Sequence, residues 1–307
     1  MVYSDSGNAL AASHAACTQS AKPTQNWTIG RAAVQFSGSL TGTSAILPPL
    51  TKVITVDPNG DIGIVNRSGA RPRKIADGLF PALSPDGGMV AFCAQPPGEH
   101  FTQIMLVKVN GKAIKRLTNL NGSSCSPDWS PDGHKIAFYT LQGNVTHVMI
   151  LDFDRKAITP VALGMLPRFS PDGKQLVFVR GHDAASPMQS IWVSDADGTH
   201  TRKVADTDSL FPTASWSGDG ASIVYSRDDH HRSAIFRVRL DGSAPEELAR
   251  DKDLEMYLPS ISPDGKQLVV VADNGVFRAV QLIDLDTHKS RQIAYGSRAS
   301  FRWVRSN

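Results

Sequence analysis

The sequence predicts an all-β protein, a six-bladed β-propeller built from four-stranded blades. A short turn segment recurs five times, with its aspartates 46, 40, 47 and 45 residues apart, which is the period of a propeller blade. Apolar strands of similar length follow every copy, and the two chain ends hold complementary fragments of one further repeat. The aspartates of the five copies are Asp86, Asp132, Asp172, Asp219 and Asp264.

The recurring segment is a turn whose residues each have a conformational role. Four copies read Ser-Pro-Asp-Gly, and the fifth is Ser217-Gly-Asp-Gly220. Proline sets φ near −65°, the aspartate accepts backbone N–H groups, and glycine supplies a positive φ. We therefore interpret these aspartates as structural rather than catalytic, and we expect Gly218 to loosen its turn.

The strands after each turn are graded from apolar to polar. The strand after the third turn contains Leu176–Val179, and the next one contains Ile191–Val193, both apolar. A short polar strand such as Arg202–Val204 then ends the repeat. In a radial array the inner strands are covered by neighbouring blades, whereas the outermost strand faces water and is protected by charge.

The chain ends predict how the ring closes. Residues 52–76 have three strands but no innermost one, and Ala299–Trp303 reads as an innermost strand with nothing after it. We expect the C-terminal strand to join the N-terminal blade and to close the ring. The propeller then covers residues 45–307, and residues 1–44 form a flexible N-terminal arm without the features of a signal peptide.

Composition narrows the classes of partner. The net charge is only +3 and the basic residues are scattered, so nucleic acid is not expected as a partner. No apolar run approaches the ~20 residues that a membrane span needs, and we expect a monomer. The three cysteines, Cys17, Cys93 and Cys125, have no metal-ligand spacing. We do not expect a disulfide framework, and Cys93 is interpreted as a small buried side chain.

The repeat resembles that of TolB-type β-propellers. The resemblance rests on the pattern Pro-x-aromatic-Ser-Pro-Asp-Gly, followed by a Leu-Val/Ala-Phe strand and later by Asp-Gly, and it covers roughly residues 50–307. It implies a six-bladed propeller that mediates protein–protein contacts in the cell envelope, in the periplasm or another extracytoplasmic compartment. Similar propellers also occur in oligogalacturonate lyases and in prolyl-oligopeptidase-type enzymes.

Charged residues near the predicted channel are the first candidates for a site. Asp128, Arg168 and Arg302 occupy equivalent positions in three repeats, directly after the inner-strand proline or its equivalent. Charges near a packed channel are uncommon without a partner. Two interpretations stay open: these residues contact an acidic or polar ligand at the channel mouth, or they form a mutual salt-bridge set.

The loops predicted at the channel mouth provide further candidates, because variable loops on a rigid scaffold tend to carry function. They include residues 95–101, 119–126, 141–147 and 251–258. We expect His100, Phe101 and Tyr257 to contact a partner, since buried aromatic residues dominate interface energetics. Phe80 and Phe211 also lie there, but both directly precede the inner-strand proline and are interpreted as packing residues.

The leading hypothesis is a non-catalytic module that binds a protein or peptide through these loops and needs no cofactor. The alternative is a metal-dependent polysaccharide lyase of the oligogalacturonate type, or another hydrolase, at the same mouth. In it one divalent metal ion, held by His182, His230 and His231, would acidify a proton of the substrate. The sequence has no Gly-x-Ser-x-Gly elbow and no phosphate-binding loop.

Overall fold

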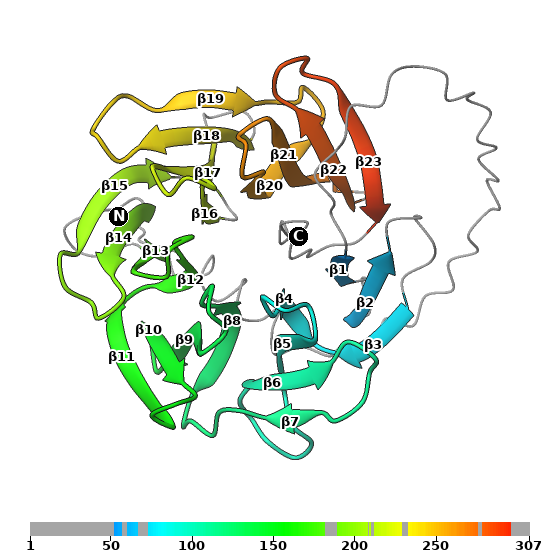
Figure 1. The fold of residues 1–307 in the computed structure, drawn as a ribbon, viewed down its shortest axis with the longest axis vertical. Helices are drawn as coiled ribbons and strands as arrows, with labels where there is room; N and C mark the ends of the chain where they lie inside the picture. The colour runs from blue at the N-terminus through cyan, green and yellow to red at the C-terminus, as the bar shows by residue number, and fades with distance from the viewer. Residues whose placement is uncertain are drawn as a thin grey trace, which may run out of the picture.

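The computed structural model describes residues 52–56, 60–66, 73–181, 189–207, 209, 212–228, 233–275 and 278–295. Every regular element in these ranges is a β-strand, and the strands form sheets arranged around a central axis (Figure 1). A search of the same residues for a helix long and apolar enough to cross a membrane finds none.

Five four-stranded antiparallel sheets are the blades of the ring. In each blade the strands follow chain order from the axis outward, and we number the blades 1 to 5 along the chain. Blades 1 and 2 contain the strands β4 (Leu79–Leu83), β5 (Met89–Ala94), β6 (Gln103–Lys108) and β7 (Lys115–Arg116), and β8 (Ser123–Trp129), β9 (Lys135–Gln142), β10 (Val145–Asp152) and β11 (Ala157–Leu163), respectively. Blades 3 and 4 contain β12 (Met165–Phe169), β13 (Gln175–Arg180), β14 (Gln189–Asp195) and β15 (Arg202–Thr207), and β16 (Ala214–Trp216), β17 (Ser222–Asp228), β18 (Ser233–Arg239) and β19 (Glu246–Ala249), respectively. Blade 5 contains β20 (Glu255–Ile261), β21 (Gln267–Asp273), β22 (Arg278–Asp284) and β23 (Ser290–Tyr295).

The predicted all-β propeller of four-stranded blades is confirmed, but the predicted number of six such blades is not. The described residues contain five four-stranded blades and one three-stranded sheet, which comprises β1 (Lys52–Val56), β2 (Asp61–Asn66) and β3 (Arg73–Asp77). This sheet lies between blades 1 and 5 (Figure 1). The strand expected to close the ring, residues 299–303, and the arm of residues 1–44 lie outside the described residues.

One face of the ring, here called the turn face, carries the five repeated turns. In the second copy the Ser130 hydroxyl donates to the Asp132 carboxylate over 2.6 Å and accepts the backbone N–H of Lys135. The same carboxylate accepts the backbone N–H of His134. All five copies repeat this arrangement. The aspartates thus hold the turns, as their repetition predicts.

Gly218 does not simply loosen its turn, because close packing explains the missing proline. A Cβ added at Gly218 would lie 2.3 Å from the Cα of Pro263 in blade 5, well inside van der Waals contact. Only glycine fits this approach of two backbones. The other turns also touch around the ring, but more loosely: a Cβ at Gly133 would lie 3.8 Å from Pro85.

The innermost strands carry a repeated bulge that directs side chains between blades. Phe80, Ser126, Leu166 and Leu258 each precede the inner-strand proline and have positive φ angles of 49°, 53°, 55° and 53°. The strand register shifts at each of these points. A bulge re-aims the residues after it, so the Trp129 indole reaches blade 1 and donates to the Ala82 carbonyl oxygen over 3.1 Å.

A disulfide bond joins blades 1 and 2, although we did not expect a disulfide framework. Cys93 of β5 and Cys125 of β8 are paired, and their Cα atoms are 5.0 Å apart, within the usual range for a disulfide. Both are buried in the large apolar cluster between the blades. Their separation of 32 residues hid the contact, because pairing depends on how the two blades face each other.

Candidate binding site on the mouth face

The opposite face, here called the mouth face, is where the second strand of each blade connects to the third. Within the described part of the chain four large hydrophobic residues are exposed: Phe101, Ile114, Val145 and Leu163. Phe101 precedes β6, Val145 begins β10 and Leu163 ends β11, so these three belong to the mouth face of blades 1 and 2. We call them the apolar stripe. Ile114 lies toward the turn face, just before β7.

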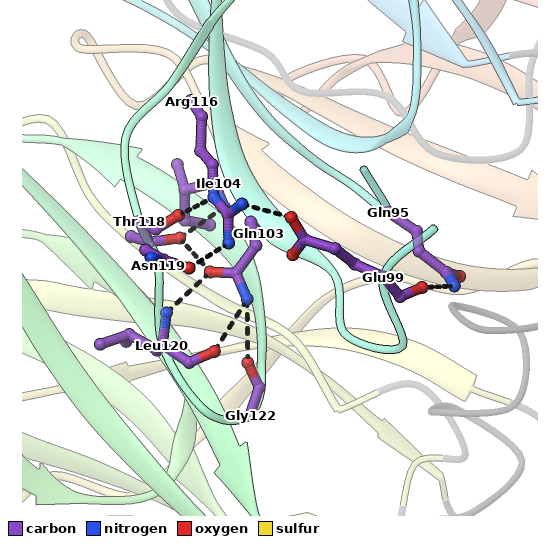
Figure 2. A network of polar contacts seen from close by, with 9 residues as sticks. All are labelled: Gln95, Glu99, Gln103, Ile104, Arg116, Thr118, Asn119, Leu120 and Gly122. Carbon is purple, nitrogen blue, oxygen red and sulfur yellow. Dashed lines mark hydrogen bonds and ion pairs between the residues drawn. The ribbon is translucent and has the colours of Figure 1, made fainter. Parts of the chain in front are cut away.

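The loop that carries Phe101, residues 95–102, is held in place by polar contacts of Gln95 and Glu99 (Figure 2). The Gln95 side chain donates to the Glu99 carbonyl oxygen over 2.5 Å, and the Glu99 N–H donates to the Pro96 carbonyl oxygen. The Glu99 carboxylate accepts from the Arg116 guanidinium at 2.5 Å. These bonds fix the turn immediately before His100, which is exposed, and Phe101, whose exposed fraction is 40%.

Arg116 extends this network from the outer strand β7. Its Nε donates to the Thr118 carbonyl oxygen over 2.6 Å, and its Nη2 donates to the Asn119 side chain over 2.5 Å. Together with Nη1 on Glu99, three nitrogens of one guanidinium hold three separate points of the mouth face. A planar guanidinium with fixed donors suits this bridging role better than a flexible ammonium group would.

The buried Gln103 amide is the centre of the network (Figure 2). Its Nε2 donates to the carbonyl oxygens of Leu120 and Gly122 at 3.0 and 3.4 Å. Its Oε1 accepts from the Thr118 hydroxyl at 2.8 Å and from the Leu120 N–H at 3.2 Å. One side chain therefore satisfies the backbone of the segment that leaves blade 1 and enters blade 2, so this connection needs no regular structure to be rigid.

The Phe101 loop is also bonded directly to blade 2. The Thr102 carbonyl oxygen accepts the Ser124 N–H at 2.8 Å, and the Thr102 hydroxyl donates to the Ser124 carbonyl oxygen at 3.2 Å. Gly122 also lies close against blade 2, because a Cβ there would lie 2.4 Å from the Leu141 carbonyl oxygen. We predicted a loop over residues 119–126, whereas β8 begins at Ser123 and incorporates its second half.

The rest of the stripe follows the strand ends of blade 2. Ser123 pairs with Leu141, Gln142 pairs with Val145, and His147 pairs with Leu163. The predicted loop 141–147 is a tight hairpin with Gly143 and Asn144 between the strands. Arg180 of blade 3 borders the stripe: its Nε donates to the Leu163 carbonyl oxygen at 3.2 Å, and its guanidinium stacks on Trp192 at 3.9 Å.

Two of the predicted channel charges form bonds between and within blades. The Asp128 carboxylate accepts the Phe169 N–H at 2.8 Å, which joins blades 2 and 3. The Arg168 Nη1 donates to the Pro167 carbonyl oxygen at 2.8 Å and to the Ser126 hydroxyl at 3.3 Å. Both side chains are half-buried. Arg302, the third predicted member, lies outside the described residues.

Tyr257 is buried rather than exposed as we expected, with 4% of its surface accessible. Strand β20 begins at Glu255 and takes up residues predicted to form a loop, so the Tyr257 ring packs with Val271 and Val280 of its own blade. Its hydroxyl donates to the Asp273 carboxylate at 3.0 Å. Burial opposes ionisation of Asp273, but the Gly275 N–H, Arg278 and the Tyr257 hydroxyl outweigh it, and the pKa of this carboxyl is lowered.

The residues of the metal hypothesis, His182, His230 and His231, all lie outside the described ranges. Among the residues that the structure does describe, no group of three histidines, cysteines, aspartates or glutamates is placed to hold a metal ion.

Sequence reasoning identified Phe101 and His100 but missed Val145, Leu163 and the supporting Gln103. A hydrophobic residue at the end of an outer strand, such as Leu163, was a signal for the stripe.

Comparison with known proteins agrees with this architecture. The model of the TolB β-propeller domain matches residues 123–300. An uncharacterised protein of Agrobacterium fabrum is 29% identical over 206 residues, which cover 62% of this chain and 68% of that protein. The Tol-Pal system protein TolB of Francisella tularensis is 28% identical over 191 residues, which cover 60% of this chain but only 43% of TolB.

A solved structure has the same fold. The crystal structure of TolB from Acinetobacter baumannii superposes with a TM-score of 0.64 at 18% sequence identity, over 82% of this chain and 64% of that one. At this identity the superposition establishes the fold alone. The match of the domain model covers more than half of the sequence, and the chain therefore belongs to the TolB β-propeller domain family.

Proposed function

We propose that this chain is a non-catalytic binding module that recognises a protein or peptide partner through its mouth face. The observation that supports the proposal is the presentation of Phe101. This exposed aromatic residue stands on a loop that is fixed by Arg116, Glu99 and Gln103 before any partner arrives. An apolar side chain exposed on so well-ordered a loop suits the burial of a partner's surface.

The rigidity of the loop matters because ordering a flexible loop on binding costs free energy. Each immobilised side chain costs about 0.5–1.5 kcal/mol, and a loop that is ordered beforehand avoids much of this. Val145 and Leu163 extend the apolar surface across blade 2, so a partner would bury several hydrophobic groups at once. The TolB proteins among the relatives are Tol-Pal system proteins by name, which fits a role in protein assembly.

We further infer that residues 299–303 complete the three-stranded sheet as an innermost strand and close a sixth blade. In the five complete blades an innermost strand precedes the apolar strand that β1 resembles. β1 also contacts β4 of blade 1, as the second strand of a neighbouring blade would. Deleting residues 299–307 should therefore leave β1 with an open edge and lower the melting temperature.

A display experiment tests the binding proposal without knowledge of the natural partner. A random peptide library is selected on the immobilised full-length chain, and the dissociation constants of enriched peptides are measured by fluorescence anisotropy. Phe101→Ala should weaken binding about 30-fold, the loss typical of an interface hot spot of about 2 kcal/mol. Ile114→Ala is the matched control, because Ile114 is equally apolar and even more exposed, but lies toward the other face.

The two variants separate the outcomes. Peptides that lose affinity for Phe101→Ala and keep it for Ile114→Ala support recognition at the mouth face. Peptides that bind both variants as tightly as the native chain would place recognition elsewhere and contradict the proposal. Circular dichroism melts of both variants check that neither substitution alters the fold.

A further inference from the structure

The disulfide between Cys93 and Cys125 encloses the whole support of the Phe101 loop. Cys93 lies two residues before Gln95, where the network begins, and Cys125 lies three residues after Gly122, where it ends. Every residue drawn in Figure 2 falls within the covalent loop that this bond closes. No other cysteine occurs in the described ranges, so the bond distinguishes this seam from the other described blade interfaces.

The bond also joins the two elements between which the loop is held. Cys93 belongs to β5 of blade 1 and Cys125 to β8 of blade 2, the strand that Thr102 contacts. The remaining ties at the mouth end of this seam are hydrogen bonds: Thr102 with Ser124, and Gln103 with Gly122. Hydrogen bonds such as these open locally far more easily than a covalent bond breaks.

We propose that the Cys93–Cys125 bond is a redox-controlled lock on the Phe101 loop. With the bond formed, the mouth ends of blades 1 and 2 are fixed relative to each other, and the loop is ordered. With the bond reduced, the seam opens locally and Phe101 loses its fixed position. The part of this proposal that concerns partner affinity rests on the proposed function; the part that concerns loop order does not.

The redox step is an ordinary thiol–disulfide exchange with a small-molecule or protein disulfide. The two thiols lose two protons and two electrons in total, the sulfur–sulfur bond forms between Cys93 and Cys125, and the oxidant's disulfide becomes two thiols. Reduction by a dithiol runs the same exchange in reverse. Because both cysteines are buried, exchange requires the seam to open first, so the lock should respond slowly to its surroundings.

The effect should stay local, because the lower part of the seam has other contacts. The Trp129 indole still donates to the Ala82 carbonyl oxygen, and Ala91 and Ile136 still pack in the same apolar cluster. We therefore expect reduction to loosen the mouth end without separating the blades. Unfolding of the whole ring is not expected.

Hydrogen–deuterium exchange with mass spectrometry tests the lock directly. The oxidised chain, whose bond is verified by its mass before and after reduction, is compared with Cys93→Ala/Cys125→Ala. Amides of residues 95–122 should exchange about tenfold faster in the variant, as expected when local opening becomes easier. Amides of β20 in blade 5 should be unchanged, and Cys17→Ala, which leaves the bond intact, should exchange like the native chain.

A second preparation keeps the test decisive if the double variant does not fold. The native chain is then compared with and without a reducing phosphine, with free thiols counted in each sample. Equal exchange of residues 95–122 in the two states, or three free thiols in protein refolded with oxidised glutathione, would overturn the proposal. Faster exchange confined to these residues supports it.

Peptide binding separates this proposal from the proposed function. A peptide that depends on Phe101 should bind the reduced or doubly substituted chain about tenfold more weakly, because its loop must then be ordered on binding. If such a peptide binds both redox states equally, the part of the proposal that concerns partner affinity is wrong and the proposed function stands. If no peptide depends on Phe101, the proposed function fails, whereas the exchange result still decides whether the loop is locked.

Discussion

The two faces of the ring are built in opposite ways. On the turn face, five copies of one turn repeat the same three hydrogen bonds, so each aspartate has an equivalent in every blade. On the mouth face, the network around Gln103 and Arg116 joins two particular blades, and its bonds depend on residues that the other repeats lack. The same scaffold thus has one face on which the five blades make the same contacts and one face on which a network joins two particular blades.

This difference shows where structure and function separate in a repeat protein. A residue that recurs in every blade stabilises every blade, so its chemistry cannot mark one site. A network that joins two particular blades can order one loop and present one surface, and Phe101 of the apolar stripe stands on that loop. The following predictions test whether the two faces respond as this contrast implies, beginning with the largest effect.

The largest effect is expected at the centre of the mouth-face network. Gln103→Leu keeps the volume but removes four hydrogen bonds to Thr118, Leu120 and Gly122. Because a buried polar group left without a partner costs about 1–3 kcal/mol, we expect the free energy of unfolding to fall by about 3 kcal/mol. Urea unfolding followed by tryptophan fluorescence measures this change.

A glutamine on the turn face provides the matched control. The Gln175 side chain is half-buried, and within the described part of the chain it makes one hydrogen bond, of 3.3 Å, to Asp195. Gln175→Leu should therefore cost less than about 1 kcal/mol. Equal losses for the two substitutions would show that the network of the mouth face is no more important to stability than an ordinary surface contact.

The repeat explains why much of the fold was predictable. The turn residues act through local chemistry, so Ser-Pro-Asp-Gly identifies the same turn wherever it occurs, and the apolar strands after it follow in register. Contacts between blades were not predictable in this way. The Cys93–Cys125 bond and the approach of Gly218 to Pro263 depend on how strands far apart in the sequence face each other.

The sequence predicted members of the candidate site only where the residue type and the predicted loop around it already indicate an exposed binding residue. Phe101 is an aromatic residue in a loop of unusual length, and it is exposed as expected. Tyr257 has the same chemistry, but β20 extends over it and buries it, and strand boundaries are the least certain part of a sequence-based prediction. Gln103 gave no signal, because a buried glutamine is recognisable only from the backbone groups around it.

Restoring the repeat pattern on the turn face should destabilise the protein. Gly218→Pro adds a Cβ that would lie 2.3 Å from the Pro263 Cα, and we expect the loss to be about 2 kcal/mol, as for other overpacked sites. A proline that merely completed the turn would instead stabilise the chain by about 0.4–1 kcal/mol. The sign of the change in urea midpoint separates the two cases. Gly218→Ala, which carries the same Cβ, should also destabilise.

A smaller effect concerns acid stability. The Ser130 hydroxyl and then the His134 N–H lower the pKa of Asp132, and the Ser170 hydroxyl and then the Lys174 N–H lower that of Asp172. A carboxyl whose folded pKa lies below its unfolded value contributes stability above about pH 4, and this contribution is lost as the pH falls through the folded pKa. The melting temperature should therefore drop steeply in this acidic range.

The serines provide the variant that tests this cause. Ser130→Ala/Ser170→Ala removes the largest influence on both carboxyls, so the melting temperature should depend less on pH below about pH 4. The control is Ser124→Ala, since the Ser124 hydroxyl is buried and bonds to no aspartate or other group among the described residues. It should change stability without changing its pH dependence. An unaltered acid profile in the double variant would mean that other groups govern acid unfolding.

The smallest effect is expected from a chelator, which tests whether the mouth face contains a metal as well as a binding surface. A metal that binds only the folded state raises its stability, and its removal lowers the melting temperature in proportion to how tightly it was bound. The binding module needs no metal, so we expect the same melting temperature with and without EDTA. A lower temperature with EDTA, together with one metal ion per chain by elemental analysis, would favour the lyase hypothesis. His182→Ala, His230→Ala and His231→Ala would then show whether these histidines hold the ion, because each should abolish the response to the chelator.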